Sequence, residues 1–221
     1  MTDSVRAARA KRLVKALKEA YPVVKSELSY ETPFQFLVAV MLSAQCTDKK
    51  VNAVTRSLFR KYRSAADFAA SSASELARKI SSITYFNAKA KHIVAAAQKV
   101  TREHGGRVPA TERELVALPG VGYKTAHVVL GELYGIWEGI PTDTHVKRFA
   151  YRFALSDATD LTKISKDLEA LIPKEDWKYV NNGLVLYGRY TCPARPHDCS
   201  EHLLTKIWPP AGSRWPKAPQ S

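Results

Sequence analysis

The sequence predicts an all-α protein made of two helical domains. Hydrophobic residues recur along most of the chain at the three-to-four-residue spacing of amphipathic helices, and no segment shows the strict alternation of a half-buried strand. Threonine, aspartate and asparagine stand just ahead of several of these segments, where they can cap a helix. We place one domain at residues 26–136 and the other at residues 1–25 together with 137–221.

Four helices are predicted in the first half of the chain. A basic amphipathic helix runs from Val5 to Tyr21. The second begins at Thr32-Pro33-Phe34-Gln35, which combines an N-cap, a proline at the first helical position and a capping-box glutamine. The run that follows is apolar on all sides, so this helix is expected to be central. Asp48 is expected to cap the third helix and Asn87 the fourth, which ends near a pair of glycines at 105–106.

The second half begins with a capping box at Thr111-Glu112-Arg113-Glu114, which opens a short helix that ends before Pro119. A new helix with an apolar face is predicted over Tyr123–Tyr134. Three further helices are predicted at Thr144–Phe153, Leu161–Leu171 and Trp177–Leu186. Residues 208–221 are rich in proline and basic residues, and we expect a loose tail there.

The charge of the chain points to a polyanionic partner. Thirty-four lysines and arginines against 21 acidic residues leave a formal net charge of +13. Nucleic acid is the partner expected for such a charge, because binding to phosphates releases counterions; a merely solubilising surface is the alternative.

The same totals argue against membranes and secretion. No apolar run approaches the ~20 residues that span a bilayer. Three cysteines, an odd number, argue against a secreted disulfide framework. We therefore expect a cytoplasmic protein, associated with the nucleoid, that has no membrane partner. We also expect a monomer.

A glycine-rich turn joins the helix before Pro119 to the helix that begins at Tyr123. Gly120 and Gly122 allow unusual backbone angles and carry no side chain that would keep a ligand away. Backbone N–H groups at the start of the next helix can then point at a phosphate. We expect Gly120, Val121 and Gly122 to contact the DNA backbone in this way; an ordinary helix–helix turn is the alternative.

Lys124 and Asp143 are the candidate catalytic residues. An amine with an ordinary pKa is protonated at neutral pH and cannot attack. The first turn of a helix disfavours a second positive charge, and partial burial would act in the same direction. Asp143 could accept the proton of the lysine and offset positive charge on a sugar. Two other roles remain open: Lys124 as a phosphate contact, and Asp143 as the cap of the helix that begins at Thr144.

Several sequence blocks together carry a family resemblance. They are Leu42–Asp48, Phe86–Ala90, Leu118–Ala126, Asp143–His145 and Tyr187–Cys192. In this order they resemble the helix-hairpin-helix DNA glycosylases, and endonuclease III in particular, over about residues 34–192.

The resemblance implies an enzyme of base excision repair. Its substrate would be double-stranded DNA that contains damaged bases or abasic sites. A catalytic cleft would lie between two helical domains, and a lysine matching Lys124 would attack the sugar C1′ with help from an aspartate matching Asp143. The implied reaction is the removal of oxidised pyrimidines through a Schiff base, followed by β-elimination (AP-lyase activity).

Two residues match positions that open the duplex in this family. Gln45 corresponds to a residue that enters the gap left by the extruded nucleotide. Tyr85 stands where relatives often carry a leucine wedge, and its ring could stack on the orphaned base. Phe86 beside it is expected in the core. The alternatives are a half-buried structural tyrosine and a glutamine that binds backbone groups.

Relatives commonly carry a [4Fe–4S] cluster on four cysteines. Cys192 and Cys199 match the first two positions, whereas His202 and Trp208 occupy the other two, and Cys46 lies in another segment. We therefore expect no cluster and no metal, with Cys192 and Cys199 as remnants of the motif. Arg195, in the intervening loop, is expected to contact a phosphate.

Two further possibilities concern this C-terminal segment. Apolar packing is expected to take the place of the cluster, through Leu203, Leu204, Ile207 and Trp208. A zinc site that joins His202 and His197 to the two cysteines is chemically possible, but the spacing is irregular. A disulfide is not expected in a reducing compartment.

Two rival functions stay open. One is a glycosylase for mismatched or ultraviolet-damaged pyrimidines, because the motifs do not include the base pocket. The other is a non-catalytic module that binds damaged DNA, against which Lys124 and Asp143 together speak. Lys147 and Arg148 next to Asp143 are possible cations of the cleft, with a solvated helix face as the alternative.

Overall fold

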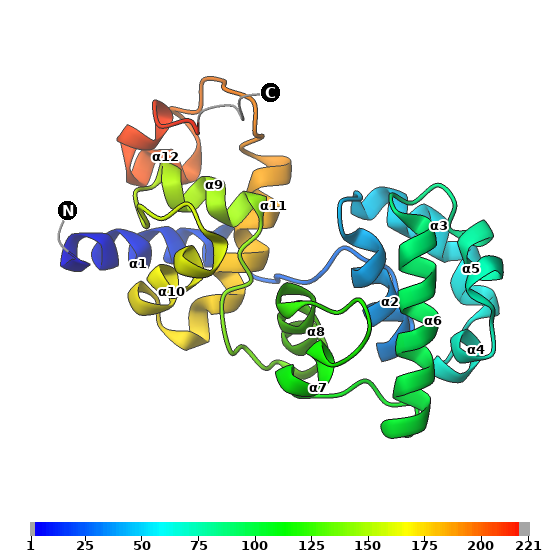
Figure 1. Ribbon diagram of the computed structural model, residues 1–221. Coiled ribbons are helices and arrows are strands. Elements are labelled where there is room, and N and C mark those ends of the chain that lie inside the picture. The colour runs from blue at the N-terminus through cyan, green and yellow to red at the C-terminus, as the bar shows by residue number, and fades with distance from the viewer. Residues whose placement is uncertain (1–2, 217–221) are drawn as a thin grey trace. The chain divides into compact units, whose positions relative to one another are not determined.

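The computed structural model describes residues 3–216, and every regular element in that range is a helix (Figure 1). The prediction of an all-α fold is thus confirmed. The chain divides into two compact units, one of residues 26–136 and the other of residues 1–25 and 137–221. Within residues 3–216, no helix combines the length and the hydrophobicity needed to cross a membrane.

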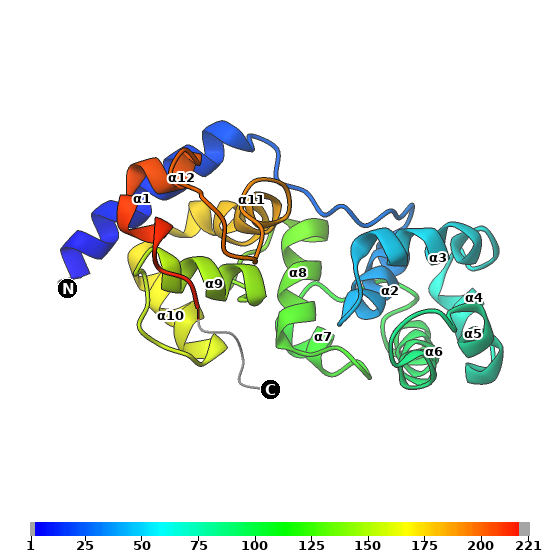
Figure 2. The ribbon, with the colours of Figure 1, turned by 90° about the horizontal axis from the view of Figure 1, so that it is seen from above.

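The unit of residues 26–136 is built around one buried helix. Its helices are α2 (Pro33–Ser43), α3 (Asp48–Lys61), α4 (Ala65–Ala69), α5 (Ala73–Lys79), α6 (Phe86–Glu103), α7 (Glu112–Val116) and α8 (Tyr123–Tyr134). Helix α2 is buried from Phe34 to Leu42 and packs against α3, α6 and α8. The two short helices α4 and α5 lie along α6 (Figures 1 and 2).

The capping signal of α2 does more than start the helix. The Thr32 hydroxyl accepts a hydrogen bond from the Gln35 amide at 3.3 Å, and the Gln35 side-chain oxygen accepts from the Thr32 amide at 3.3 Å. The Gln35 side-chain amide, which is fully buried, donates to the carbonyls of Phe59 and Tyr62 at 3.2 and 3.0 Å. One glutamine therefore completes the predicted capping box and joins α2 to the end of α3.

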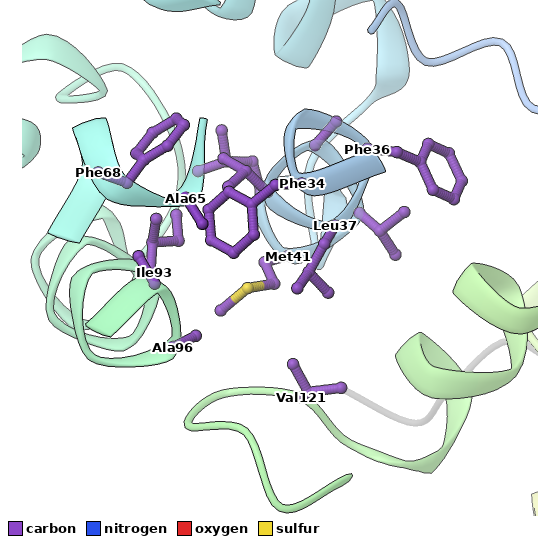
Figure 3. Packing of buried hydrophobic residues seen from close by; sticks show 14 of the residues in the cluster. Phe34, Phe36, Leu37, Met41, Ala65, Phe68, Ile93, Ala96 and Val121 are labelled. Carbon is purple, nitrogen blue, oxygen red and sulfur yellow. The ribbon is translucent and has the colours of Figure 1, made fainter. Parts of the chain in front are cut away.

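The core of this unit forms between α2 and the helices around it. The ring of Phe34 lies 5.6 Å from that of Phe68 in α4, centroid to centroid. Met41 and Ile93 belong to the same buried cluster (Figure 3). Burial of each such side chain contributes roughly 1.5–3 kcal/mol, so the apolar character of α2 accounts for its central position.

Two predicted helix caps differ from the structure, and a third capping motif forms only in part. Thr47, and not Asp48, caps α3, and its hydroxyl accepts from the Lys50 amide at 3.3 Å. Asn87 does not cap α6; this helix starts two residues earlier than expected, after Tyr85, which has left-handed backbone angles and no capping side chain. At α7 the capping box is only half formed, because the Glu114 carboxylate accepts from the Thr111 hydroxyl at 2.6 Å.

The other unit joins the N-terminal helix to the C-terminal part of the chain. Its elements are α1 (Asp3–Ala20), α9 (Thr144–Arg152), α10 (Leu161–Leu171), the 3₁₀ helix η1 (Lys174–Asp176), the π-helix η2 (Tyr179–Gly183), α11 (Leu184–Tyr190), α12 (Leu203–Ile207) and the 3₁₀ helix η3 (Pro209–Gly212). Helix α1 packs against η2, α10 and α12, and α9 packs against α10 and α11. Leu17, Phe149, Phe153 and Tyr187 are all buried between them.

Two expectations for this unit are wrong. The single helix expected at Trp177–Leu186 is a π-helix followed by α11, which continues to Tyr190. Hydrophobic spacing does not distinguish i→i+5 from i→i+4 hydrogen bonds over so few residues. Nor are residues 208–216 a loose tail: Ala211 is buried, and the Trp215 ring lies against the Arg152 guanidinium. Residues 217–221, the rest of the expected tail, lie outside the described residues.

Candidate active site

The glycine turn between α7 and α8 is held in place by close packing. Leu118 and Val121 are buried on either side of Gly120. Gly120 has φ +77°, and a Cβ placed there would come within 2.6 Å of the Cβ of His92 in α6. Because the Val121 side chain belongs to the core, only the backbone of this residue remains available to a ligand.

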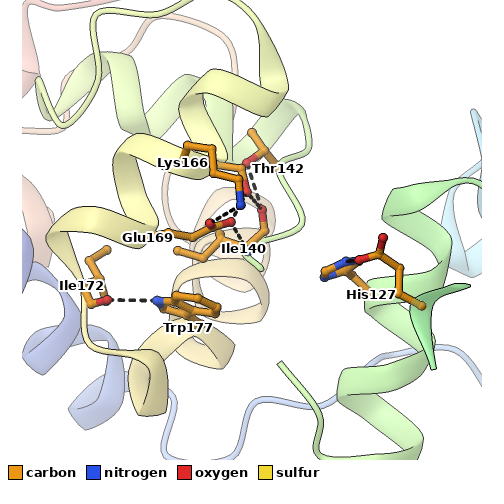
Figure 4. A network of polar contacts seen from close by, with 9 residues as sticks. His127, Ile140, Thr142, Lys166, Glu169, Ile172 and Trp177 are labelled. Atoms are coloured by element: carbon orange, nitrogen blue, oxygen red, sulfur yellow. Dashed lines mark hydrogen bonds and ion pairs between the residues drawn. The ribbon is translucent and has the colours of Figure 1, made fainter. Parts of the chain in front are cut away.

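A hydrogen bond between a buried histidine and a partly exposed glutamate joins the two helices of this hairpin. The His127 Nε2 atom lies 2.6 Å from a carboxylate oxygen of Glu112, and the His127 side chain is only 1% exposed (Figure 4). The Tyr123 ring lies 4.1 Å from the His127 ring. The sequence does not predict the contact between His127 and Glu112, because the two residues lie in different helices. This contact fixes the angle at which α8 leaves the turn.

Helix α8 starts at the turn without a capping side chain, since its N-cap is Gly122. Its first-turn amides and the positive end of its dipole therefore form the kind of site that binds an anion. Lys124, the second residue of α8, is exposed. The amine of Lys124 is thus carried on the first turn of the helix, at the end where the helix dipole is positive.

Substitution of Gly120 tests the packing of the turn. Gly120→Ala is expected to lower the free energy of unfolding by about 2 kcal/mol or more, because a left-handed backbone and a clash with His92 act together. DNA binding should weaken in parallel. Urea unfolding and a fluorescence binding assay measure the two effects.

Gly106→Ala is the matched control for backbone strain. Gly106 has φ +79° with open space around it, so alanine there should cost only the backbone term of about 1–2 kcal/mol and leave DNA binding intact. Equal losses of stability and binding in both variants would contradict the packing argument for Gly120.

Asp143 lies in the other unit and caps α9. Its Oδ1 atom accepts from the amides of His145 and Val146 at 2.8 and 2.9 Å. The side chain is half-buried. The capping role considered for Asp143 is therefore present in the structure, and it holds the carboxylate in one orientation at the start of the helix.

Hydrogen bonds also anchor the loop that leads to Asp143. The Ile140 carbonyl accepts from the Ser165 hydroxyl at 2.8 Å, and the Ile140 amide donates to Glu169 at 3.3 Å (Figure 4). Burial alone would raise the pKa of Glu169, but the hydrogen bonds that it receives outweigh burial and lower this pKa. The loop is thus tied to α10, and Asp143 is carried on a fixed support.

Gln45 and Tyr85 share an unusual backbone conformation. Among the described residues, the non-glycine residues with positive φ are Gln45 (54°), Tyr85 (57°) and Ala154 (48°). Both Gln45 and Tyr85 are exposed, whereas Phe86 is half-buried against the core, as expected. Left-handed angles cost a non-glycine residue about 1–2 kcal/mol, and such strain is typical of functional positions.

A buried lysine supports the turn that presents Gln45. The Lys89 amine donates to the carbonyls of Leu42 and Ala44 at 2.7 and 2.6 Å, at the end of α2. Burial lowers the pKa of Lys89. This contact was not foreseen, because a lysine in a helix is normally counted as part of the solvated face. It holds the backbone immediately before Gln45.

Glycine substitutions separate strain from function at these two positions. Gln45→Gly and Tyr85→Gly are expected to change the free energy of unfolding by less than about 1 kcal/mol, since relief of strain offsets the greater freedom of the unfolded chain. Base excision should nevertheless fall by about tenfold or more, because the side chains that would fill the duplex gap are lost. Single-turnover excision and thermal unfolding measure the two effects.

Ala154→Gly is the control, because it relieves the same strain at a buried position in the other unit. It should leave excision unchanged. Full excision by both the Gln45 and the Tyr85 variants would show that neither residue serves to open the duplex.

Four side chains near the C-terminus could together hold a metal ion. They are Cys192, His197, Cys199 and His202, and their ligand atoms all lie within 4.8 Å of one another. The cysteine spacing predicts no metal and makes Cys192 and Cys199 remnants of a motif; this grouping does not support that prediction. In the described part of the chain neither thiol forms a disulfide. Arg195 is exposed in the loop between them.

Two arginines lie inside this unit and bind backbone carbonyls there. Arg148 is 7% exposed and donates to the Cys192 carbonyl at 2.9 Å, so it is not part of a solvated helix face. Lys147 beside it is exposed. Arg9 donates to the Phe153 carbonyl at 2.7 Å. The carbonyls that these arginines bind lie in distant segments of the chain, so no local sequence pattern predicts the contacts.

The C-terminal apolar residues contribute unequally. Leu204 is fully buried, and Ile207 and Trp208 pack partly against the same core. Leu203 is 41% exposed and adds little. The expectation that all four pack in the core is therefore right only in part.

The described residues form an all-helical fold with a glycine hairpin. A lysine stands at the following helix start, and an aspartate caps another helix. These features together are those of the helix-hairpin-helix DNA glycosylases. The sequence model of the family described as "HhH-GPD superfamily base excision DNA repair protein" matches residues 38–174. The chain belongs to this family.

Individual relatives support the same conclusion over nearly the whole chain. Endonuclease III of Synechocystis sp. is 43% identical over 203 residues, which cover 92% of this chain and 93% of that protein. Endonuclease III of Bacillus subtilis is 41% identical over 190 residues, 86% of each chain. A solved structure of a trapped covalent intermediate of endonuclease III and DNA aligns with a TM-score of 0.87 and 34% identity, over 97% of this chain and 99% of that chain. The chain is a base-excision DNA glycosylase with AP-lyase activity.

Proposed function

We propose that this enzyme removes oxidised pyrimidines from double-stranded DNA and then cuts the strand, with Lys124 as nucleophile and Asp143 as the assisting carboxylate. The observation that carries the proposal is the position of Lys124, in the first turn of a helix that begins, uncapped, at the glycine turn. The backbone at Gly122 can then bind a phosphate, and the amine of Lys124, two residues further along the chain, can reach the adjoining sugar. A relative that forms a covalent intermediate with DNA lends further support.

The chemistry follows from the two side chains. The neutral Lys124 amine forms a bond to the sugar C1′ while the bond from C1′ to the base breaks, and the base leaves with its electron pair and takes up a proton. The Asp143 carboxylate offsets the positive charge that develops on the sugar and can receive the proton of the amine. Opening of the sugar ring gives a Schiff base on Lys124.

Strand cleavage then needs only one further elimination. The iminium makes the C2′ proton acidic, and its removal drives out the phosphate from C3′. Hydrolysis of the conjugated Schiff base releases the enzyme. No redox partner is required.

The remaining candidates serve DNA binding in this proposal. The amides at Gly120, Val121 and Gly122 hold a phosphate near the extruded nucleotide, and Gln45 and Tyr85 fill the gap that it leaves. Arg195 adds a phosphate contact from the loop between Cys192 and Cys199. An enzyme with this substrate would work in the cytoplasm at the nucleoid.

A panel of duplexes, each with one defined lesion, tests the substrate assignment. Oxidised pyrimidines should be excised fastest, and borohydride should trap a covalent adduct both with these and with an abasic site. Faster excision of mismatched or ultraviolet-damaged pyrimidines would overturn the lesion preference but keep the mechanism. A protein that binds the duplexes without an adduct or a nick would overturn both.

We also propose that the enzyme holds no [4Fe–4S] cluster. Such a cluster is bound by four thiolates, and the whole sequence contains three cysteines. In the group formed by Cys192, His197, Cys199 and His202, only two of the four side chains are thiols and the other two are imidazoles. Protein purified without oxygen should contain neither stoichiometric iron nor acid-labile sulfide. A brown chromophore that persists through purification would refute this proposal.

A further inference from the structure

The C-terminal cysteine–histidine group lies apart, in sequence, from every residue assigned to catalysis, and it has a chemistry of its own. We propose that Cys192, His197, Cys199 and His202 bind a single zinc ion as a structural site. Two thiolates and two imidazoles form one of the usual ligand sets for structural zinc. This inference does not depend on the catalytic roles proposed for Lys124 and Asp143.

The distances suit one ion. Zinc binds sulfur at about 2.3 Å and imidazole nitrogen at about 2.0–2.1 Å, so two ligands of one ion lie at most about 4.6 Å apart. All four ligand atoms here lie within 4.8 Å of one another, and Cys192 Sγ is 3.9 Å from His197 Nε2. Small side-chain rotations therefore complete the site. Ligands on different irons of a multinuclear cluster would have to stand further apart.

The orientation of His197 is that of a metal ligand. Its Nδ1 atom lies 2.7 Å from the Arg195 carbonyl, so Nδ1 carries the proton and donates it to this oxygen. The lone pair is then on Nε2, the atom that lies near Cys192 Sγ. A hydrogen bond from one ring nitrogen to a backbone carbonyl is the usual way in which proteins orient a histidine whose other nitrogen binds a metal.

His202 supplies a second, independent indication. Its Nδ1 atom is buried and has no hydrogen-bond partner among the described residues. A buried polar atom without a partner is unfavourable, because it has lost its water and gained nothing in return. The backbone turn in which the His202 amide donates to the Cys199 carbonyl at 3.0 Å keeps this imidazole beside the second thiol. A zinc ion coordinated by the His202 imidazole would offset this unfavourable burial.

Arg152 places hydrogen-bond donors beside both sulfurs. This fully buried guanidinium donates to Cys192 Sγ at 2.9 Å and to Cys199 Sγ at 3.0 Å, and also to the Ala211 carbonyl. Two thiolates would neutralise the charge of the zinc ion, and the guanidinium would bind the negative charge that remains on the sulfurs. Donors of this kind orient and stabilise metal-bound thiolates.

Four protein ligands leave zinc no open position, so the site would be structural and not catalytic. Cys192 follows α11, and His202 directly precedes α12. The ion would therefore fasten the loop between these helices, which also carries Arg195.

Metal analysis of the full-length protein is the first test. Mass spectrometry of purified protein should find about one zinc per chain. Removal of zinc by a chelator should lower the melting temperature by on the order of 5 °C, and zinc alone should restore it. Cobalt(II) added to the zinc-free protein should give the visible bands of a tetrahedral site and sulfur-to-cobalt charge transfer. Protein with no bound metal, or with iron and sulfide, overturns the proposal.

Variants then assign the ligands. Cys199→Ser and His197→Gln should each reduce the zinc content at least tenfold under dialysis, while Cys46→Ser, a cysteine in the other unit, should retain it. If a ligand variant does not fold, wild-type protein provides the test instead. The two thiols of the metal-free protein are alkylated, and added cobalt(II) should then give no sulfur-to-cobalt charge-transfer band. Zinc retained by Cys192→Ser/Cys199→Ser protein refutes the site.

Discussion

Lys124→Ala is expected to abolish covalent trapping on an abasic-site duplex and to reduce base excision by at least about a thousandfold. Without the amine no bond to C1′ can form, so neither the Schiff base nor the elimination that depends on it can follow. The side chain is exposed on α8, so its removal should leave the fold intact. Borohydride trapping, strand nicking and circular dichroism measure these three outcomes.

Lys124→Arg separates the nucleophile from a phosphate contact. Arginine keeps the positive charge but stays protonated, so it cannot attack a sugar. Binding to an abasic-site duplex should therefore stay within a few-fold of wild type, while trapping and nicking are lost. If the arginine variant nicks DNA at the wild-type rate, Lys124 serves only to hold a phosphate.

Asp143→Asn is expected to lower base excision by about 10²–10⁴-fold with little change in stability. Asparagine is as good an N-cap as aspartate, so its side-chain oxygen can accept from the amides of His145 and Val146 as Asp143 does now. What it lacks is the negative charge. A large loss of excision at an unchanged melting temperature would therefore mark an electrostatic or proton-accepting role.

Asp143→Ala provides the comparison, because it removes both the charge and the cap. It should lose excision to the same extent as Asp143→Asn and, in addition, about 1 kcal/mol of stability. Single-turnover excision with urea unfolding of both variants gives the answer. Wild-type excision by Asp143→Asn would show that the residue is only a helix cap.

The elements that could be predicted are those specified by neighbouring residues. The start of α2 follows from Thr32 and Gln35, which satisfy each other's backbone groups within one turn. The bounds of α8 and α10 follow from apolar spacing between clear stop signals. Helix α4 was missed although Ser64 and Asp67 form a capping box of the same kind, so the signal was present in the sequence.

The candidate catalytic residues follow from local pattern and from the family resemblance together. The glycine turn and the helix start next to Lys124 lie within a few residues of it, so the sequence shows both. The strain at Gln45 and Tyr85 was not visible, because neither residue type favours a left-handed backbone. At Gln45 the buried Lys89 supports the turn from another helix.

By itself the sequence determined the helical class and the positions of the longer helices, because caps, turns and apolar spacing act over a few residues. Local pattern together with the family resemblance pointed to Lys124 and Asp143. Only the tertiary structure decided the interior of the C-terminal unit. Arg152 in α9 meets there the two thiols of Cys192 and Cys199, which lie 40 and 47 residues further along the chain. Burial of a charge is favourable only where distant partners converge on it, and that convergence is a property of the folded chain.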